Sequence, residues 1–431
     1  MKIQKRKNES GQIIIIMAVA FVGLLGFVAL AIDVGMVYAD RRYDQSVADA
    51  SALAGAAIAA QSLDNHSVML GNFTCGSSGV LAAWADAENA AIARAADNNF
   101  VIDTDLSDNL GVQVTCGNED LGAVKKKYLD IKVMISSQVN TAFAHLVFPG
   151  AVKNTVESVT RVYPREPFAS GFAISSTSKD CDESLYFDGD STVIVHNSGV
   201  HSNSCLTTNG GIEVEATGPT AGIFYIDTLK INGGGVLDPA ATQTAIELPT
   251  QEPVRLDCTF SDMTPKSSTG GGSITPGIYS QIKLNAGDTL NLAPGLYCLD
   301  GDLKATGGTL TGDNVTLYLR SGDFEIGGNV TVNLSAPTSD AYAPARNGLL
   351  IYADPGNDAT VDVLGGASSS YTGTIYVPSG ELGVGGNSGI NPTYNTQLIA
   401  YTIKVHGTSD IDIYFNEELA ANNPPMVDQL Q

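Results

Sequence analysis

Residues 294–334 read PGLYCLDGDLKATGGTLTGDNVTLYLRSGDFEIGGNVTVNL, and this stretch decides the class of fold. Short alternating runs such as Val315–Leu319 and Val330–Leu334 are separated by turns of Gly, Asn, Asp and Ser. Pro294–Tyr297 repeats the pattern of Pro276–Tyr279, and runs recur after about 18 to 25 residues. Such repeats are typical of a parallel β-helix, in which each coil buries its apolar residues by stacking on the next. The predicted fold is a mainly-β, right-handed parallel β-helix, with a β-sandwich as the alternative because short strands also fit that fold.

The same pattern occupies most of the chain after Phe168. Helical periodicity disappears there, and short β runs follow one another for the rest of the molecule. We therefore predict a β-helix domain over residues 169–418 and a tail over residues 419–431. A Pro- and Thr-containing interruption at residues 239–272 is predicted to be a lateral loop inserted in the stack of coils.

The N-terminal part of the chain predicts a membrane-spanning helix. Residues Ile13–Ile32 form an unbroken run of 20 uncharged, almost wholly apolar residues, and a helix of that length crosses roughly 30 Å of hydrocarbon. Residues 1–12 carry a net charge of +3, which leaves −26 for residues 13–431. The positive-inside bias then predicts a cytoplasmic N-terminus in a single-pass protein, with the bulk of the chain extracytoplasmic or on the cell surface. The alternative is a secretory signal cleaved near Ala29–Ala31, which also exports the rest of the chain.

The helical pattern continues past the span as a predicted stalk helix over residues 33–61. A narrow apolar seam recurs there at spacings of three and four residues, and small residues at its start would let two helix backbones approach closely. Asp33 directly follows the apolar run and is interpreted as a boundary carboxylate at the edge of the hydrocarbon. The predicted helix-packing residues are Ala31, Gly35, Ala39, Tyr43, Val47, Ala50, Ala54 and Ala57.

Residues 62–165 mix the two kinds of secondary structure. An Ala-rich helical pattern covers Val80–Asn98, and alternating strand patterns follow at Val112–Cys116, Tyr128–Ile135 and Val156–Tyr163. This composition predicts a small α+β domain built against the stalk helix.

Several motifs of the first 60 residues occur together in a known family. Glu9-Ser10-Gly11-Gln12 precedes the apolar run, Ala31-Ile32-Asp33-Val34-Gly35 ends it, and residues 48–57 read ADASALAGAA. In this order they resemble the N-terminal module of Flp pilus-assembly TadE/TadG-like proteins, and residues 294–418 look like the β-helical region that follows such anchors in some envelope proteins. The resemblance implies an envelope protein connected with a tight-adherence pilus. It departs from pilin-like signals at Ile16, which stands where those signals have Glu, so processing by a prepilin peptidase is not expected.

The cysteines predict disulfides. They are even in number, far apart and without a CxxC pair, which excludes zinc ribbons and thioredoxin-type motifs. An exported chain makes disulfides natural, and free thiols are the alternative. Domain membership favours the pairs Cys75 with Cys116, Cys181 with Cys205, and Cys258 with Cys298.

Catalytic and metal-binding patterns are weak. The sequence lacks GxSxG, HExxH and Walker-type motifs, and its histidines are scattered. A metal site formed by His196 and His201 with Asp188 and Asp190 is an alternative to solvated turns. The scattered histidines are His66, His145, His196, His201 and His406.

Carboxylates are the remaining candidates for chemistry, because polysaccharide lyases and hydrolases also use the parallel β-helix. Asp-Gly pairs are foremost turn-forming sequences, so we predict no catalytic, cofactor-binding or metal-binding residue and expect no enzymatic activity. The acidic candidates are Asp188, Asp190, Asp300, Asp302 and Asp354–Asp358.

Composition limits the partners. The chain of 431 residues has a net charge of −23, and only 16% of its residues are charged. Nucleic acid is not an expected partner, because its binding needs clustered cations. The expected function is a membrane-anchored structural or adhesion protein of a Flp/Tad-type pilus or the cell envelope, with other envelope proteins, further copies of itself and surface glycans as candidate partners. The alternatives are a filament subunit packed through the N-terminal helix and a membrane-tethered polysaccharide lyase or hydrolase.

Overall fold

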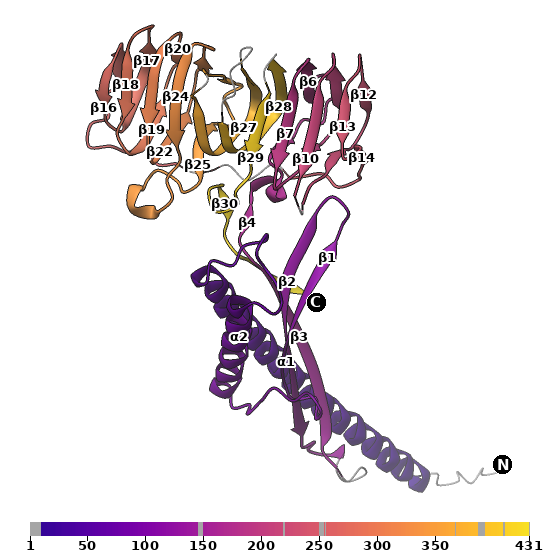
Figure 1. Cartoon of the computed structure of the whole chain (residues 1–431). Coiled ribbons are helices and arrows are strands. Elements are labelled where there is room, and N and C mark those ends of the chain that lie inside the picture. Colours follow the sequence, from indigo (N-terminus) through magenta and orange to yellow (C-terminus); the bar gives the residue numbers. More distant parts are fainter. Residues whose placement is uncertain are drawn as a thin grey trace, which may run out of the picture. The chain divides into compact units, whose positions relative to one another are not determined.

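A computed structural model of the chain describes residues 10–144, 150–218, 220–249, 254, 256–366, 368–386, 393–407 and 410–430. The chain forms two compact units (Figure 1). The first, called the helical unit here, comprises residues 1–118, 127–164 and 425–431, and the second, the solenoid unit, comprises residues 119–126 and 165–424. The solenoid unit is therefore inserted into the helical unit, which the chain leaves after residue 164 and rejoins at residue 425.

Two helices and a four-stranded sheet make up the helical unit. Helix α1 (Ser10–Asn65) runs without interruption for 56 residues, and helix α2 (Ser78–Asp97) follows. Helix α1 ends where Ser67 adopts a left-handed φ of 52° and the Val68 amide donates to the Leu63 carbonyl at 2.9 Å. The sheet has the order β1 (Gly111–Asp120), β2 (Lys125–Val139), β3 (Val152–Tyr163) and β31 (Met426–Leu430). Strand β3 is antiparallel to both β2 and β31, so the last described residues of the chain complete the sheet.

Small residues let α1 and α2 pack closely against each other and the sheet. A Cβ atom at Gly55 would lie 2.9 Å from the Ala87 carbonyl oxygen and 3.1 Å from the Ile131 side chain. The buried stripe of α1 comprises Ala48, Ala52, Gly55, Ala56 and Ala59, and it faces Ala83, Ala87, Ala91 and Ala95 of α2. The contact between α1 and α2 therefore depends on close backbone approach, while larger side chains such as Leu129 and Ile131 of β2 fill the core beside it.

The solenoid unit is a parallel β-solenoid of about ten turns, and its parallel strand pairs rule out an antiparallel β-sandwich. Three faces, called A, B and C here, are each a column of parallel strands. Face A contains β5 (Ile174–Ser176), β8 (Val200–Ser202), β11 (Ile223–Tyr225), β14 (Thr242–Gln243), β19 (Gly295–Leu299), β22 (Val315–Leu319) and β25 (Leu349–Ala353). Face B contains β6 (Leu185–Gly189), β9 (Leu206–Asn209), β12 (Leu229–Ile231), β15 (Lys266–Thr269), β20 (Leu303–Ala305), β23 (Phe324–Ile326) and β26 (Thr360–Val363).

Face C contains β7 (Thr192–His196), β10 (Glu213–Thr217), β13 (Val236–Asp238), β16 (Gly272–Ile274), β18 (Thr289–Leu292), β21 (Gly308–Gly312), β24 (Val330–Ser335) and β29 (Ile411–Tyr414). Three longer strands join faces: β17 (Gly277–Leu284) belongs to A and B, whereas β27 (Ser370–Gly386) and β28 (Thr393–Gly407) run through all three. The remaining short elements are β4 (Glu166–Pro167), which pairs with β30 (Asn422–Asn423), and the 3-10 turns η2 (Phe168–Gly171) and η3 (Asp340–Tyr342).

Residues in equivalent positions of successive coils stack inside the solenoid. On face A, for example, the strand register places one buried apolar side chain over the next along the stack, which removes nearly all of their surface from water. This inward ladder comprises Tyr297, Leu317, Ile351, Ile375, Leu398, Ile174, Val200 and Ile223.

The order of coils in space differs from their order in the sequence. Strand β28, near the end of the chain, pairs in parallel with β5 and β6, the first strands of the solenoid, and β29 pairs with β7. Figure 1 shows β28 and β29 in yellow beside β6 and β7 in magenta. The chain therefore enters the solenoid in the middle of the stack, coils to the end formed by β11–β14, and resumes at the opposite end with β15 and β16.

Residues 244–265, called the return segment here, connect the two ends of the stack. They fall within the interruption predicted as a lateral loop at 239–272, but they join two blocks of coils. Among the described residues of this segment, Leu248 and Val254 are buried in the apolar cluster that includes the outer side of face A. The amide of Leu248 donates to Asn203 Oδ1 at 2.9 Å, and the amide of Val254 donates to the Tyr352 hydroxyl at 3.1 Å. The Cys258–Cys298 disulfide then ties the segment to β19.

The side chains beneath the return segment form an outward ladder on face A. Tyr318, Tyr352 and Tyr376 stack in succession, with ring centroids 5.3 and 5.6 Å apart. These tyrosines belong to a second apolar cluster of this unit. The return segment contributes Leu248 and Val254 to it, and η2 contributes Phe168, whose ring centroid lies 5.8 Å from that of Tyr376.

Candidate functional site

The apolar run at the start of α1, residues 13–32, is exposed in the described part of the chain. Its side chains are mostly more than half exposed, for example Phe21 at 64% and Phe27 at 74%. The most apolar 18-residue window has a mean hydropathy of 3.0 and no buried residue, so α1 is long and apolar enough to cross a membrane. A core helix of a soluble protein would be buried instead, whereas a signal sequence near an N-terminus shares these properties.

Asp33, the first charged residue after the apolar run, binds the connection between β2 and β3. The amides of Ala142, Phe143 and Ala144 donate to its carboxylate at 2.7, 3.1 and 2.6 Å. Asp33 is only 4% exposed. Three converging amide groups form an anion-binding nest, which replaces the water that a carboxylate would otherwise need. The predicted boundary carboxylate thus has a structural partner 109 to 111 residues away in the chain.

Two more carboxylates on the same side of α1 hold the hairpin. Asp40 accepts from Asn154 Nδ2 at 3.0 Å and Asp44 accepts from the Ser137 hydroxyl at 2.5 Å. Asp44 is fully buried, and that burial raises the pKa of its carboxyl, against the lowering effect of the Ser137 hydrogen bond. Asp33, Asp40 and Asp44, called the acidic stripe here, therefore fix the β2–β3 hairpin along the helix.

The sequence alone predicts no binding partner for these three carboxylates. Their spacing of seven and four residues was the available signal, because it places all three on one side of an α-helix. Their partners lie in a distant hairpin, which the helical pattern does not specify.

The predicted helix-packing residues have several environments. Val47 is buried, Ala50 and Ala54 are half-buried, and Tyr43 and Ala57 are exposed. The stripe that packs within the helical unit is therefore rotated from the predicted seam. Ala31, Gly35 and Ala39 are exposed in this single chain.

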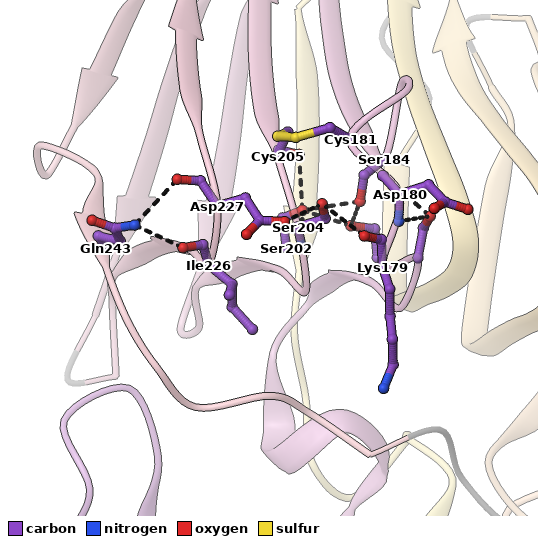
Figure 2. Close-up of a disulfide and its surroundings, with 12 residues drawn as sticks. Lys179, Asp180, Cys181, Ser184, Ser202, Ser204, Cys205, Ile226, Asp227 and Gln243 are labelled. Atoms are coloured by element: carbon purple, nitrogen blue, oxygen red, sulfur yellow. Dashed lines mark hydrogen bonds between the residues drawn. A yellow bond between two sulfur atoms is a disulfide. The ribbon is translucent and has the colours of Figure 1, made fainter.

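All six cysteines are in disulfides, and the pairs are those favoured by domain membership. Figure 2 shows the Cys181–Cys205 bridge with Asp227 nearby. Together with Asp227 these sulfurs form the one group of metal-ligand type among the described residues. Sulfurs that are bonded to each other are not thiolates, so this group is a disulfide beside a carboxylate and does not have the donors of a metal site.

A buried cluster of hydroxyl groups lies next to this disulfide (Figure 2). The Ser176 hydroxyl lies 3.0 Å from those of Ser184 and Ser202, and the Ser202 hydroxyl donates to the Cys205 carbonyl at 2.9 Å. Ser204 donates to Asp227 at 2.7 Å. These hydroxyls satisfy one another and link successive coils, which is a structural role for a corner of the solenoid.

The acidic residues that the sequence offered for catalysis mostly bridge neighbouring coils. Asp188 accepts from Asn209 Nδ2 at 2.7 Å, Asp190 accepts from the Gly211 amide at 2.8 Å, and Asp300 pairs with Arg320 at 2.6 Å. Asp302 accepts from the Asp323 amide at 3.1 Å. Asp354 accepts from the Tyr318 hydroxyl and from the Gly356 amide.

The structure does not bring His196 and His201 together with Asp188 and Asp190. His196 lies on face C, where its Nε2 is 2.8 Å from Asp412, and His201 lies beneath the return segment on face A, with its Nε2 3.0 Å from the Ile246 carbonyl oxygen. Of the other histidines, His66 directly follows α1, and its Nδ1 lies 2.8 Å from the Ser62 carbonyl oxygen. His406 is exposed on β28, and His145 lies outside the described residues.

The N-terminal helix, with its acidic stripe, is the part of the chain that a known family shares. Residues 11–59 match the family described as putative Flp pilus-assembly TadE/G-like. This TadE/G-like segment includes the apolar run and all three residues of the acidic stripe, and it ends before the β-solenoid begins. Comparisons of the chain with curated proteins and with solved structures gave no match.

Together, the TadE/G-like segment and the exposed apolar helix fit a membrane-anchored, pilus-associated protein. The TadE/G-like segment followed by the β-solenoid agrees with the resemblance noted in the sequence.

Proposed function

We propose that this chain is a structural or adhesion protein of a Flp/Tad-type pilus or of the cell envelope. In this proposal residues 13–32 span the cell membrane, residues 1–12 lie in the cytoplasm, and the solenoid unit is presented outside the membrane. Its partners would be other pilus or envelope proteins, with surface glycans as further candidates.

One observation carries the proposal. The residues that match the TadE/G-like family include an apolar run whose most apolar 18-residue window has no buried residue. Insertion of such a run into a bilayer removes its apolar surface from water, which is favourable by about 25 cal/mol of free energy per Å².

A non-catalytic role is supported by the contacts of the candidate carboxylates. Asp188, Asp190 and Asp300 are engaged with residues of adjacent coils. A glycosidase instead needs two carboxyl groups that face one substrate position.

Membrane anchoring is tested by placing charge in the apolar run. Each arginine near the centre of a span opposes insertion by about 2.5–3.5 kcal/mol, so the double variant Leu24→Arg/Leu25→Arg should leave the membrane fraction. The double variant Leu53→Arg/Ile58→Arg is the matched control, because both residues are exposed on the same helix beyond the apolar run. Equal membrane retention of the two variants would contradict the anchor.

The role at the cell surface is tested in cells that lack the chain and in cells that produce it again. We expect fewer surface filaments by electron microscopy, or unchanged filaments with weaker attachment to surfaces, and restoration by the full chain. Unchanged filaments together with unchanged attachment would refute the proposal. Recovery of the chain within sheared filaments would make it a filament subunit, and polysaccharide turnover lost in an Asp188→Asn or Asp300→Asn variant would make it an enzyme.

A further inference from the structure

The acidic stripe sets the depth at which the β2–β3 hairpin lies along α1. Twenty residues from Ile13 to Ile32 account for about 30 Å of helix, which is the thickness of the hydrocarbon layer. Asp33 therefore marks the hydrocarbon boundary when α1 spans a membrane. The three amides of residues 142–144 bind this carboxylate, so these residues are held at the same level.

Further contacts fix the direction of the hairpin. Ser137 of β2 donates to Asp44, and Asn154 of β3 donates to Asp40. From Asp44 to Asp33 the helix falls by about 16 Å, and over this distance the hairpin follows α1 towards the apolar run. Several independent hydrogen bonds thus hold Ser137, Asn154 and residues 142–144 at fixed levels along α1.

Several side chains exposed at this level are apolar or aromatic, beside the polar Asn140. Phe143, between two of the residues that bind Asp33, is 43% exposed, and on α1 Val34 and Tyr38 are 58% and 63% exposed. Arg41 and Arg42 follow at about 12 Å beyond Asp33, and the Arg42 guanidinium lies 6.0 Å from the Tyr38 ring centroid. Aromatic residues followed by basic residues are characteristic of the interface between hydrocarbon and headgroups.

We propose that residues 141–144, which follow β2 in the described part of this hairpin, are a second membrane-contacting element, with Phe143 inserted into the interfacial layer of the same bilayer that α1 crosses. The occupant of this surface is lipid, because the exposed side chains are continuous with the apolar run of the span. The inference rests on the anchoring proposed above. Asp33 links α1 to these residues, and their three amides replace the water that its carboxylate would lose at the edge of the hydrocarbon, which lowers the desolvation cost of the charge.

A tryptophan at position 143 reports directly on contact with lipid. The chain has a single native tryptophan, Trp84, on α2, whose Nε1 donates to Glu88 at 2.8 Å. The full-length chain with Trp84→Phe receives either Phe143→Trp or Val22→Trp, and each protein is reconstituted into phosphatidylcholine vesicles with bromine on the acyl chains. The wild-type chain is the distant control, because Ser62 of α1 binds Asp86 of α2 at 2.7 Å, which places Trp84 roughly 40 Å along α1 from Asp33.

We expect the emission of Phe143→Trp to be quenched, most strongly by bromine near the headgroups, and that of Val22→Trp to be quenched most strongly by bromine near the chain ends. The wild-type emission should be unaffected by either lipid. Quenching at position 22 without quenching at position 143 overturns the inference and leaves the anchor intact, whereas no quenching at position 22 overturns the anchor itself. If Trp84→Phe disturbs folding, Phe143→Trp is placed in the wild-type chain. The emission that exceeds that of wild type then comes from position 143, and its quenching or lack of quenching by the brominated lipids tests the inference in the same way.

Discussion

Burial of His201 beneath the return segment predicts an acid-sensitive contact between that segment and face A. The ring is fully buried, its Nε2 lies 3.0 Å from the Ile246 carbonyl oxygen, and its centroid is 5.2 Å from that of Phe172. Burial lowers the pKa of His201 from 6.5 to about 4, because the charged ring loses its hydration, and the hydrogen bond to Ile246 opposes this only in part. The Nε2 proton of the neutral ring is thus the donor at neutral pH.

The sign and size of the effect follow from proton linkage. The folded state holds the proton less tightly than the unfolded state, so the stability is fully present above about pH 6.5 and is lost as the pH falls towards the folded pKa of about 4. Between about pH 7.5 and about pH 4, lowering the pKa from 6.5 to about 4 removes about 3 kcal/mol of stability, which is roughly 150-fold in the opening equilibrium.

The His201→Gln variant isolates this contribution. Its amide can donate to the Ile246 carbonyl, but it has no proton to gain between these pH values. Hydrogen exchange followed by mass spectrometry would measure the protection of peptides covering residues 198–206 and 244–249, corrected for the effect of pH on intrinsic exchange. From about pH 7.5 to about pH 4, the opening free energy of wild type should fall by about 3 kcal/mol more than that of the variant.

Parallel pH profiles for the two proteins would refute the reasoning, because they would mean that His201 is hydrated or paired when charged. Burial raises the pKa of Asp44, Glu166 and Asp362, whose effects on stability have the opposite sign. They are present in both proteins, so they cancel in the comparison.

Three further predictions concern packing and cross-linking. Gly55→Leu should lower the stability of the helical unit by about 1–3 kcal/mol or more, because a Cβ there meets a backbone carbonyl oxygen of α2 at 2.9 Å. Ala57→Leu on the exposed side of α1 is the control and should have little effect. Urea unfolding followed by Trp84 fluorescence compares the two variants, and equal effects would contradict the packing. Replacing both Cys258 and Cys298 by Ala should lower the free energy of unfolding by about 4 kcal/mol on the chain-entropy model, for a sequence separation of 40. The loss should appear as faster hydrogen exchange in the return segment. Unchanged hydrogen exchange would show that the disulfide adds no constraint. Leu317→Ala in the fully buried ladder should cost about 2–5 kcal/mol in urea unfolding followed by circular dichroism, and a smaller loss would indicate that the coils collapse around the gap.

The position of the packing stripe on α1 shows where sequence periodicity becomes insufficient. The predicted seam and the observed stripe are both made of small residues at spacings of three and four, because residues 48–60 are nearly all Ala, Gly or Ser. Only contact with α2 distinguishes the sides: Gly55 faces the backbone of α2, and Ala57 faces away from it. A pattern with almost no polar interruptions identifies a helix but not its buried side.

The acidic stripe shows the same limit in the candidate site. The sequence shows a carboxylate at residue 33, at the end of the apolar run, and a charged residue there predicts a boundary. It does not show that backbone amides of residues 142–144 complete the carboxylate's hydrogen bonds. Backbone donors carry no residue-type signal, so a nest of this kind becomes visible only when the chain is folded.

The sequence by itself determined the local elements of this protein: the apolar helix from its length and lack of charge, and the coils from their repeating short runs and Gly-rich turns. It favoured the disulfide pairs by domain membership. The tertiary structure decided which coil stacks on which. Coils of a parallel solenoid present similar hydrogen-bonding edges and similar apolar rows, so local pattern allows any compatible coil to be the neighbour. Here β28 and β29 stack on the first coil. The return segment connects the two ends of the stack in the sequence, and its Val254 binds Tyr352 on face A.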